Sequence, residues 1–167
     1  YMTTGVSEEE VYEGVVSMVQ GRRVDGVVVL YSRTDDKVVQ FLQDSKFPFV
    51  VVGKPFSDSS HVTYVDTDNY LAGREVTKYL HQLGHECIAF VGGAQDLAVT
   101  QERVGGYKTA LMEEGIPIQE SYIVSAPFMT TGGAEAVKRL MSLEHPPTAV
   151  VVSDDMMALG VMSTLNE

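Results

Sequence analysis

Continuous apolar runs constrain the fold of this chain more than any other feature of its sequence. The runs are rich in valine and cover residues 24–30, 47–52, 87–91 and 149–152. A strand with one face in water alternates apolar and polar residues, whereas a strand buried on both faces has an unbroken apolar run. We therefore predict that these runs are strands of parallel sheets. Shorter strands are expected at residues 61–65 and 122–124.

Amphipathic helices separate the predicted strands. Ser7 is a predicted N-cap with Glu10 three residues later, as in a capping box, and Gly84 is placed to end another helix. The predicted helices cover residues 7–21, 35–44, 69–83, 100–114 and 131–142, with a last helix starting near Asp154. This alternation of strands and helices predicts an α/β fold whose parallel sheets are covered by helices on both faces.

The acidic composition restricts the partners of this chain. Its 12 lysines and arginines stand against 23 aspartates and glutamates, which gives a formal net charge of −11 over 167 residues. An acidic surface repels phosphate backbones and anionic lipid, so this segment is a poor binder of nucleic acid or of a membrane surface. No run reaches the roughly 18 apolar residues of a membrane span, and no secretion signal is visible. We therefore expect a cytoplasmic protein.

The two ends of the chain indicate a longer polypeptide. The chain begins at Tyr1 without an initiator methionine, in sequence typical of a strand, and it stops at Glu167 inside a helical pattern. We therefore expect an excerpt of a larger protein. The most irregular stretch, residues 53–61, is a candidate passage between two lobes. Cys87 is the only cysteine, which excludes an internal disulfide, and its apolar surroundings predict a buried structural thiol.

Polar residues follow the predicted strands where a ligand site is expected. In open α/β sheets, ligands bind beyond the carboxyl ends of the strands. The residues at that position are Tyr31, Ser32, Arg33, residues 66–69, Gly92, Gly93, Arg103, Phe128, Thr130 and residues 153–155. Carboxylate and guanidinium groups bind neighbouring hydroxyls, and an aromatic face covers the apolar side of a sugar or base. This mixture favours a polyhydroxylated ligand.

Several of these residues also have a purely structural interpretation. Asp68 and Asp154 precede predicted helices, and aspartate is a favoured N-cap. Phe128 can be a core aromatic. Arg103 differs, because it lies early in its predicted helix, where a cation opposes the helix dipole. A ligand or ion-pair role therefore explains Arg103 better than chance placement on the surface.

The motifs of common catalytic sites are missing from the sequence. It contains no G-x-S-x-G, no G-x-x-x-x-G-K-[ST] and no G-x-G-x-x-G after a strand. His81 and His85 have the spacing of a metal pair, but Gly84 between them ends the predicted helix. Asp154 and Asp155 are sequence neighbours that point in different directions, which is poor geometry for an acid–base pair. We therefore expect no catalytic residue, no metal, no cofactor and no enzyme activity.

A series of short motifs gives the sequence a family resemblance. The motifs are Asp68-Asn69-Tyr70, Leu83-Gly84-His85, Phe90-Val91-Gly92-Gly93, Arg103-Val104-Gly105-Gly106-Tyr107 and Ser153-Asp154-Asp155-Met156-Met157-Ala158-Leu159-Gly160. Each is weak alone, but their order over residues 24–160 is specific. The sequence resembles the effector-binding core of the LacI/GalR family of bacterial transcription repressors, whose fold is that of type I periplasmic sugar-binding proteins.

The resemblance implies two Rossmann-like lobes with parallel sheets, incomplete at both ends. It places residues 1–67 in the N-terminal lobe and residues 68–167 in the C-terminal lobe. It further implies a homodimer that senses a small molecule and binds operator DNA through a helix-turn-helix domain outside this chain. The ligand-binding positions that it transfers to this sequence are Arg103, Asp154, Phe128, Ser32, Tyr31 and, with a looser match, Asp68.

Two departures from the family pattern point to the ligand class. The loop with Leu97, Ala98 and Val99 is apolar where some members place polar contacts, and Leu30 replaces a polar residue. Such a wall fits a disaccharide or a large sugar better than a phosphorylated ligand, and the loops resemble those of maltose-type regulators from Gram-positive bacteria. The alternatives are a periplasmic sugar-binding protein for uptake, an α/β enzyme acting on a sugar or nucleotide, and a regulator that responds to a partner protein.

Overall fold

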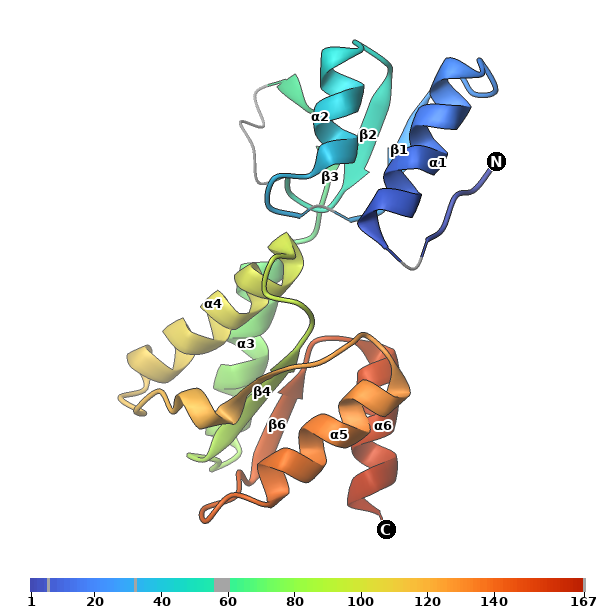
Figure 1. Cartoon of the computed structure of the whole chain (residues 1–167). Helices are drawn as coiled ribbons and strands as arrows, with labels where there is room; N and C mark the ends of the chain where they lie inside the picture. Colours follow the sequence, from blue (N-terminus) through green and yellow to red (C-terminus); the bar gives the residue numbers. More distant parts are fainter. Residues whose placement is uncertain (6, 32, 56–60, 167) are drawn as a thin grey trace. The chain divides into compact units, whose positions relative to one another are not determined.

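The computed structural model describes residues 1–5, 7–31, 33–55 and 61–166, which form two compact units (Figure 1). Unit 1 comprises Tyr1–Thr67 and unit 2 comprises Asp68–Glu167. Each unit contains a sheet of three parallel strands. The predicted α/β class with parallel sheets is therefore confirmed.

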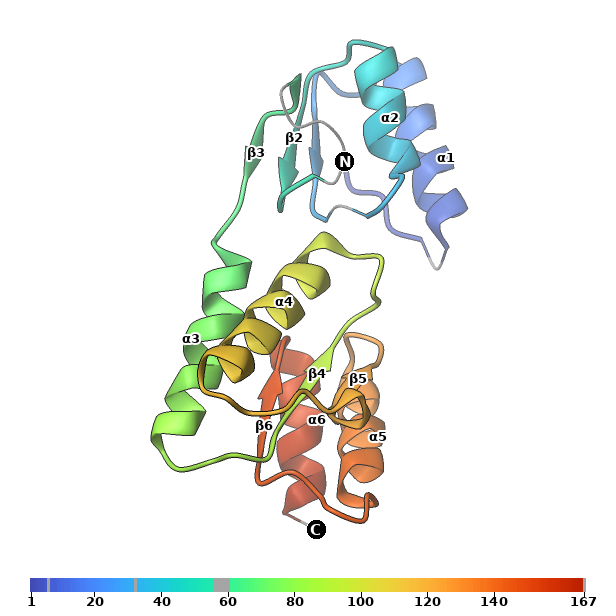
Figure 2. The same cartoon turned by 90° about the vertical axis from the view of Figure 1, so that its left-hand side faces the viewer.

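Unit 1 packs its helices on one face of its sheet. Its elements are α1 (Glu8–Gln20), β1 (Val27–Val29), α2 (Lys37–Asp44), β2 (Phe49–Val52) and β3 (Tyr64–Val65). The strand order is β1-β2-β3, with Val28 opposite Val50 and Val51 opposite Tyr64. Figure 2 shows α1 and α2 on the same side of the strands. Val15 of α1 and Leu42 of α2 are buried there against strand side chains.

The other face of this sheet carries exposed apolar side chains. Val28, Val52 and Val65 are 59%, 44% and 66% exposed. The prediction of helices on both faces is therefore wrong for unit 1, because its two described helices pack on the same face.

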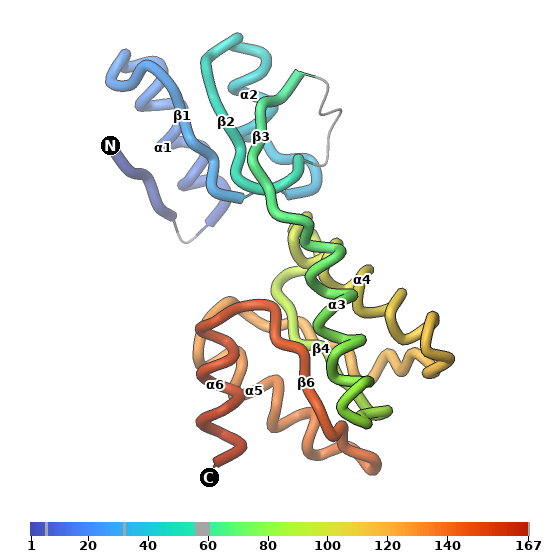
Figure 3. Tube along the Cα trace, turned by 180° about the vertical axis from the view of Figure 1, so that it is seen from behind, coloured from blue at the N-terminus to red at the C-terminus, as the bar shows by residue number. Residues whose placement is uncertain are grey.

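Unit 2 has helices on both faces of its sheet. Its elements are α3 (Asn69–Gln82), β4 (Ile88–Gly92), α4 (Ala98–Glu113), the short 3-10 helix η2 (Glu120–Tyr122), β5 (Ile123–Ser125), α5 (Thr130–Met141), β6 (Ala149–Val152) and α6 (Asp155–Leu165). The order β5-β4-β6 puts β4 in the centre. Figure 3 shows α3 and α4 on one side of the strands and α5 and α6 on the other.

Two apolar layers fill unit 2, one on each face of β4. Ala89 and Val91 face a layer completed by Leu140 and Met157 from α5 and α6. Phe90 faces the opposite layer with Tyr107 of α4, and their ring centroids are 5.4 Å apart. Full burial of such side chains stabilises the fold by about 1.5–3 kcal/mol each. The run that marked this strand in the sequence is unbroken because both of its faces are buried.

Capping residues set the helix ends much as predicted. Ser7 caps α1 by accepting a hydrogen bond from the Glu10 amide at 3.3 Å. Gly84 has φ +95° and follows α3, and the amides of Gly84 and His85 donate to the carbonyls of His81 and Leu80. This is the glycine-dependent helix end that the sequence indicated. At the amino end, residues 1–5 form no strand, contrary to expectation.

Glycines let both helix pairs of unit 2 approach at the backbone. A Cβ on Gly106 of α4 would overlap the Tyr70 carbonyl oxygen of α3, and one on Gly73 would overlap that of Arg103. A Cβ on Gly160 of α6 would overlap the Thr130 carbonyl oxygen of α5 in the same way. Each helix pair therefore depends on the absence of a side chain at its crossing.

The outer surface of the α3–α4 pair is held by charged and polar side chains. Glu113 of α4 lies 2.8 Å from Arg74 Nη2 and 3.3 Å from Lys78 Nζ, both of α3. The hydrogen bond from Arg74, followed by that from Lys78, lowers the pKa of the Glu113 carboxyl. Tyr70 also donates a hydrogen bond to Thr109 Oγ1 at 2.7 Å.

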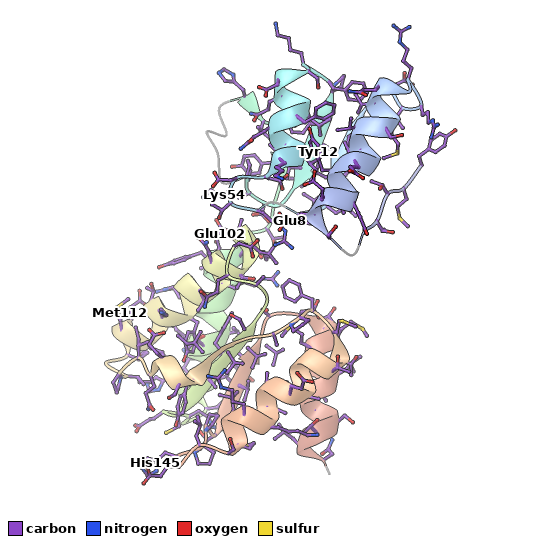
Figure 4. All side chains as sticks on the ribbon, in the orientation of Figure 1. Glu8, Tyr12, Lys54, Glu102, Met112 and His145 are labelled. Atoms are coloured by element: carbon purple, nitrogen blue, oxygen red, sulfur yellow. The ribbon has the colours of Figure 1, made fainter. Side chains whose placement is uncertain are left out.

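Side-chain packing in unit 1 is dominated by aromatic and aliphatic groups. Tyr12 of α1 points toward α2 (Figure 4), where its ring meets Phe41 edge to face at a centroid distance of 5.9 Å.

Among the described residues of both units, no helix combines the length and apolar character needed to cross a lipid bilayer. Cys87, which precedes β4, is half-buried against the core and not fully buried as predicted.

Candidate functional site

The carboxyl ends of the three strands of unit 2 lie side by side. The Val91 carbonyl of β4 accepts a hydrogen bond from the Ser153 amide at 2.9 Å, and the Gly92 carbonyl accepts one from the Ala126 amide at 2.9 Å. These bonds extend the β4–β6 and β4–β5 pairing past the last strand residues. The segments that follow β4, β5 and β6 therefore begin at one shared edge, which is where a site was predicted.

Arg103 is anchored at this edge by two hydrogen bonds. Its Nε donates to Asn69 Oδ1 at 2.9 Å, and its Nη1 donates to the Ser153 carbonyl oxygen. Asn69 is the first residue of α3 and is only 4% exposed. Side-chain hydrogen bonds of this kind fix the plane of a guanidinium, and Nη2 is outside both bonds.

The helix crossing explains why Asn69 can reach Arg103. Both residues lie near the amino ends of their helices, where α3 and α4 touch through Gly73 and Gly106. A side chain on either glycine would force the helices apart. Gly106 belongs to the Arg103-Val104-Gly105-Gly106-Tyr107 motif, so the motif combines a charged side chain with the contact that positions it.

Asp154 and Asp68 are both helix N-caps, as the structural interpretation of the sequence held. Asp154 Oδ1 accepts from the Met157 amide at 3.0 Å, and Asp68 Oδ1 accepts from the Leu71 amide at 2.7 Å. Each capping bond uses one carboxylate oxygen, Oδ1. Asp154 directly follows Ser153, whose carbonyl binds Arg103, so their charges lie in the same region.

Phe128 lies against the end of β4. A Cβ on Gly93 would overlap its ring, so the ring contacts the backbone of Gly93 directly. The side chain is 37% exposed. Phe128 is therefore neither a buried core residue nor a freely projecting one. It presents part of its ring at the edge that also carries Arg103 and Asp154.

Ser153 adds a polar group that is not among the predicted site residues. It is 9% exposed, and its Oγ has no hydrogen-bond partner among the described residues. Ser153 and Asn69 were both placed at the strand ends by sequence, but neither was chosen as a site residue. The sequence could not indicate their role, because only the fold shows that both residues hold the Arg103 guanidinium.

The remaining predicted residues lie in unit 1 or outside the described residues. Tyr31 follows β1, is 40% exposed, and has the Arg33 guanidinium 5.5 Å from its ring centroid. Arg33 also pairs with Glu8 at 3.2 Å. Ser32 lies outside the residues that the structure describes. Within unit 1, Tyr31 therefore sits in a charged setting at the carboxyl end of its strand.

The apolar loop residues do not form the surface that the sequence suggested. Leu97 and Ala98 are 7% and 8% exposed, so they belong to the interior of unit 2. Leu30 in unit 1 is 69% exposed and remains available at a surface. The two candidate metal histidines have other contacts: His81 Nδ1 lies 3.3 Å from the His85 carbonyl, and His85 Nδ1 lies 3.0 Å from Thr148 Oγ1.

Comparison with known protein families shows to which class of protein this chain belongs. The family described as periplasmic binding proteins and sugar binding domain of the LacI family matches residues 4–167. The chain belongs to the LacI family. This assignment confirms the resemblance drawn from the sequence motifs.

Relatives of this LacI-family chain are transcriptional regulators, not enzymes. The regulator MalR of Streptococcus pneumoniae is 35% identical over 161 residues, which are 96% of this chain and 48% of MalR. The crystal structure of a transcriptional regulator LacI from Bacillus cereus subsp. cytotoxis has a TM-score of 0.95 and 48% identity, covering 99% of this chain and 59% of that one.

A second solved structure contains a sugar. A complex of the transcriptional regulator CelR with cellobiose has a TM-score of 0.90 and 32% identity, covering 99% of this chain and 51% of that one. The chain thus spans about half the length of the curated relatives that it matches, 48% in the case of MalR.

Proposed function

We propose that this LacI-family chain is the effector-sensing core of a cytoplasmic transcriptional repressor and that it binds a neutral saccharide. The observation that carries the proposal is the anchored Arg103 at the strand ends of unit 2, with Asp154 and Phe128 at the same edge. Units 1 and 2 then correspond to the N-terminal and C-terminal lobes of an effector-binding domain.

The three side chains offer the complementary groups that a sugar requires. In this proposal Arg103 donates hydrogen bonds to sugar hydroxyls and Asp154 accepts hydrogen bonds from them. The exposed part of the Phe128 ring covers the apolar C–H groups of the sugar. A charge-assisted hydrogen bond contributes about 1.5–3 kcal/mol, and an aromatic contact about 0.5–1.5 kcal/mol beyond plain burial. Tyr31, Ser32 and Asp68 complete the proposed set of ligand-binding residues.

A maltose-type disaccharide is the ligand class that we propose first. A complex of the relative CelR contains cellobiose, a neutral disaccharide, and MalR is among the curated relatives. A neutral ligand also fits a net charge of −11, which disfavours an anionic sugar phosphate.

The remaining half of the protein supplies the output in this proposal. A helix-turn-helix domain binds operator DNA, and the sugar shifts the core between two states. The ligand moves that equilibrium only by its differential affinity, about 1.4 kcal/mol for each tenfold preference.

The regulator acts as a homodimer, and α6 offers the surface in unit 2. Met156, Leu159 and Met162 of α6 are 50%, 56% and 60% exposed, and Asp155 is the one charged residue in this helix. Two copies of an acidic chain repel each other wherever carboxylates meet. An apolar, almost uncharged helix face is therefore the surface at which a second copy can pack.

Calorimetric titration of the complete protein tests the ligand assignment. Maltose, cellobiose, other neutral sugars, sugar phosphates and purines are titrated into the wild type and into Arg103→Ala. We expect binding of a neutral disaccharide that Arg103→Ala weakens by about 100-fold or more, since charge-assisted bonds are lost.

A matched control is Arg139→Ala, which removes an exposed arginine from the last turn of α5. It lies at the helix end opposite the strand-end edge and should bind as the wild type does. Circular dichroism shows whether each variant is folded. Equal sugar binding by folded Arg103→Ala and wild type, or tighter binding of a sugar phosphate, contradicts the proposal.

A further inference from the structure

Unit 2 contains a hollow on the side of α4 that faces away from α3. Its volume is about 290 Å³, and it lies between α4, the edge strand β5 and the 3-10 helix η2. Phe90, Val104 and Ile123 supply apolar lining, while Thr100, Lys108 and Glu120 supply polar groups.

The hollow reaches the carboxyl end of β5 at Ser125, but it lies on a different side of α4 from Arg103. An α-helix has about 3.6 residues per turn, so Thr100, Val104 and Lys108 lie on one flank of α4. Arg103 and Gly106 lie on the other flank, which contacts α3. A molecule in the hollow would therefore use a different side of the helix from a molecule bound to Arg103.

A buried hydroxyl without a partner marks this hollow as more than a packing defect. Thr100 is 4% exposed, and its Oγ1 has no hydrogen-bond partner among the described residues. Burying a hydroxyl in this way is costly, so native proteins nearly always pair such groups. A hydroxyl of a bound molecule would satisfy it.

The rim of the hollow carries one positive and one negative group. Lys108 Nζ lies 3.0 Å from Glu120 Oε1, and both side chains line the hollow. Their charges cancel, yet the pair still offers donors and acceptors. A neutral ligand with several hydroxyls fits this rim, and its C–H groups fit the apolar lining.

We propose that this hollow is a second small-molecule site, which takes a neutral polyol no larger than a monosaccharide. A volume near the lower end of the range for ligand pockets accommodates roughly a dozen non-hydrogen atoms. The site is independent of the proposed effector site, since it uses neither Arg103 nor Asp154.

Methyl NMR of the complete protein, labelled at isoleucine and valine, tests this site. The probes are D-glucose, D-xylose and myo-inositol, with glucose 6-phosphate as the anionic comparison. We expect saturable, millimolar shifts of the Val104 and Ile123 methyls with a neutral probe. Thr100→Val keeps the shape but removes the hydroxyl, so it should weaken binding by about tenfold and raise the melting temperature of the free protein.

Two more variants separate this site from the effector site. Val104→Phe fills the hollow and should abolish the shifts, whereas Arg103→Ala should leave them unchanged. Thr164→Val makes the same exchange on α6 and should have wild-type affinity.

The proposal is overturned by any of three results. The first is that neither methyl signal shifts with any neutral probe, which would mean that the hollow holds only water. The second is unchanged affinity in Thr100→Val. The third is loss of the shifts in Arg103→Ala. Failure of the disaccharide titration would sink the effector proposal and leave this one standing, because the two tests have different reporters.

Discussion

At the scale of single residues, the candidate site is organised by an uncharged side chain. Asn69 is almost fully buried and accepts from Arg103 Nε, while the Ser153 backbone accepts from Nη1. The guanidinium is thus held by two neutral oxygens, which add no negative charge beside it. A carboxylate in the place of Asn69 would neutralise much of the positive charge of the guanidinium.

The first prediction concerns this anchor. Asn69→Ala should lower the free energy of unfolding by about 1–3 kcal/mol, because it leaves the Arg103 Nε without its partner. It should also weaken sugar binding, although we do not place Asn69 among the ligand contacts. Urea unfolding and calorimetry measure the two effects.

Asn166→Ala provides the comparison, because Asn166 is exposed at the end of α6. That variant should match the wild type in both measurements. Normal sugar affinity in a folded Asn69→Ala protein would mean that the anchor does not position Arg103 for binding.

Residue types and positions could be predicted from sequence here, but their contacts could not. The placement of Arg103, Phe128 and Asp154 after strands was readable because parallel strands end at a common edge. The bond from Arg103 to Asn69 joins residues 34 positions apart. It depends on how two helices cross, which no local pattern encodes.

At the scale of elements, the α3–α4 crossing controls the site. The second prediction compares two adjacent glycines of α4. A Cβ on Gly106 would overlap the backbone of Tyr70, while one on Gly105 would meet the Tyr70 ring at an ordinary 3.5 Å.

Gly106→Ala should therefore destabilise the protein by about 1–3 kcal/mol, as overpacking does, and should weaken sugar binding. Gly105→Ala should be neutral or stabilising by up to about 1 kcal/mol, because alanine favours a helix. Thermal unfolding of both variants checks this. Equal melting temperatures would show that the helices can separate without cost.

The third prediction concerns the acid sensitivity of the same helix pair. The pKa of Glu113 is lowered by hydrogen bonds from Arg74 and Lys78. Its contribution to stability is present above the unfolded-state pKa of about 4.3 and is lost as the pH falls toward the folded-state pKa. At pH values below about 4.3, the free energy of unfolding should therefore decrease as the pH is lowered. Glu113→Gln should make this decrease smaller.

Urea unfolding at neutral and acidic pH measures this slope. Glu135→Gln, on the exposed face of α5, should keep the wild-type slope. An identical acid dependence in Glu113→Gln and wild type would assign the effect to other carboxylates. Added salt should shrink the difference, since these side chains are partly exposed to solvent, where salt screens their charges.

Element types were predictable, but their extents and coverage were less so. The strand expected over residues 24–30 is limited to Val27–Val29, because these are the residues that pair with β2. Coverage of both sheet faces held for unit 2 and failed for unit 1. Apolar runs report that a face avoids water, but they do not say which segment covers it.

At the scale of the whole molecule, self-association is the property to test. The fourth prediction is that Met162→Glu in α6 shifts the complete protein from dimer to monomer, since it places like charges opposite each other in the interface. Sedimentation at several concentrations measures this equilibrium.

Met112→Glu is the matched control. Met112 lies on α4 (Figure 4) and is 61% exposed, close to the 60% of Met162. It should leave the dimer intact. An unchanged dimer in Met162→Glu would exclude the face of α6 as the contact between copies.

The glycine crossings of unit 2 also bear on how its specificity can be redesigned. Helices that touch through their backbones keep their spacing whatever side chains surround the contact. The loops beyond the strands can therefore be exchanged to change the ligand while the two helix pairs keep their spacing. Unit 2 could therefore serve as the scaffold of an engineered biosensor, provided that the glycines at the helix crossings are kept.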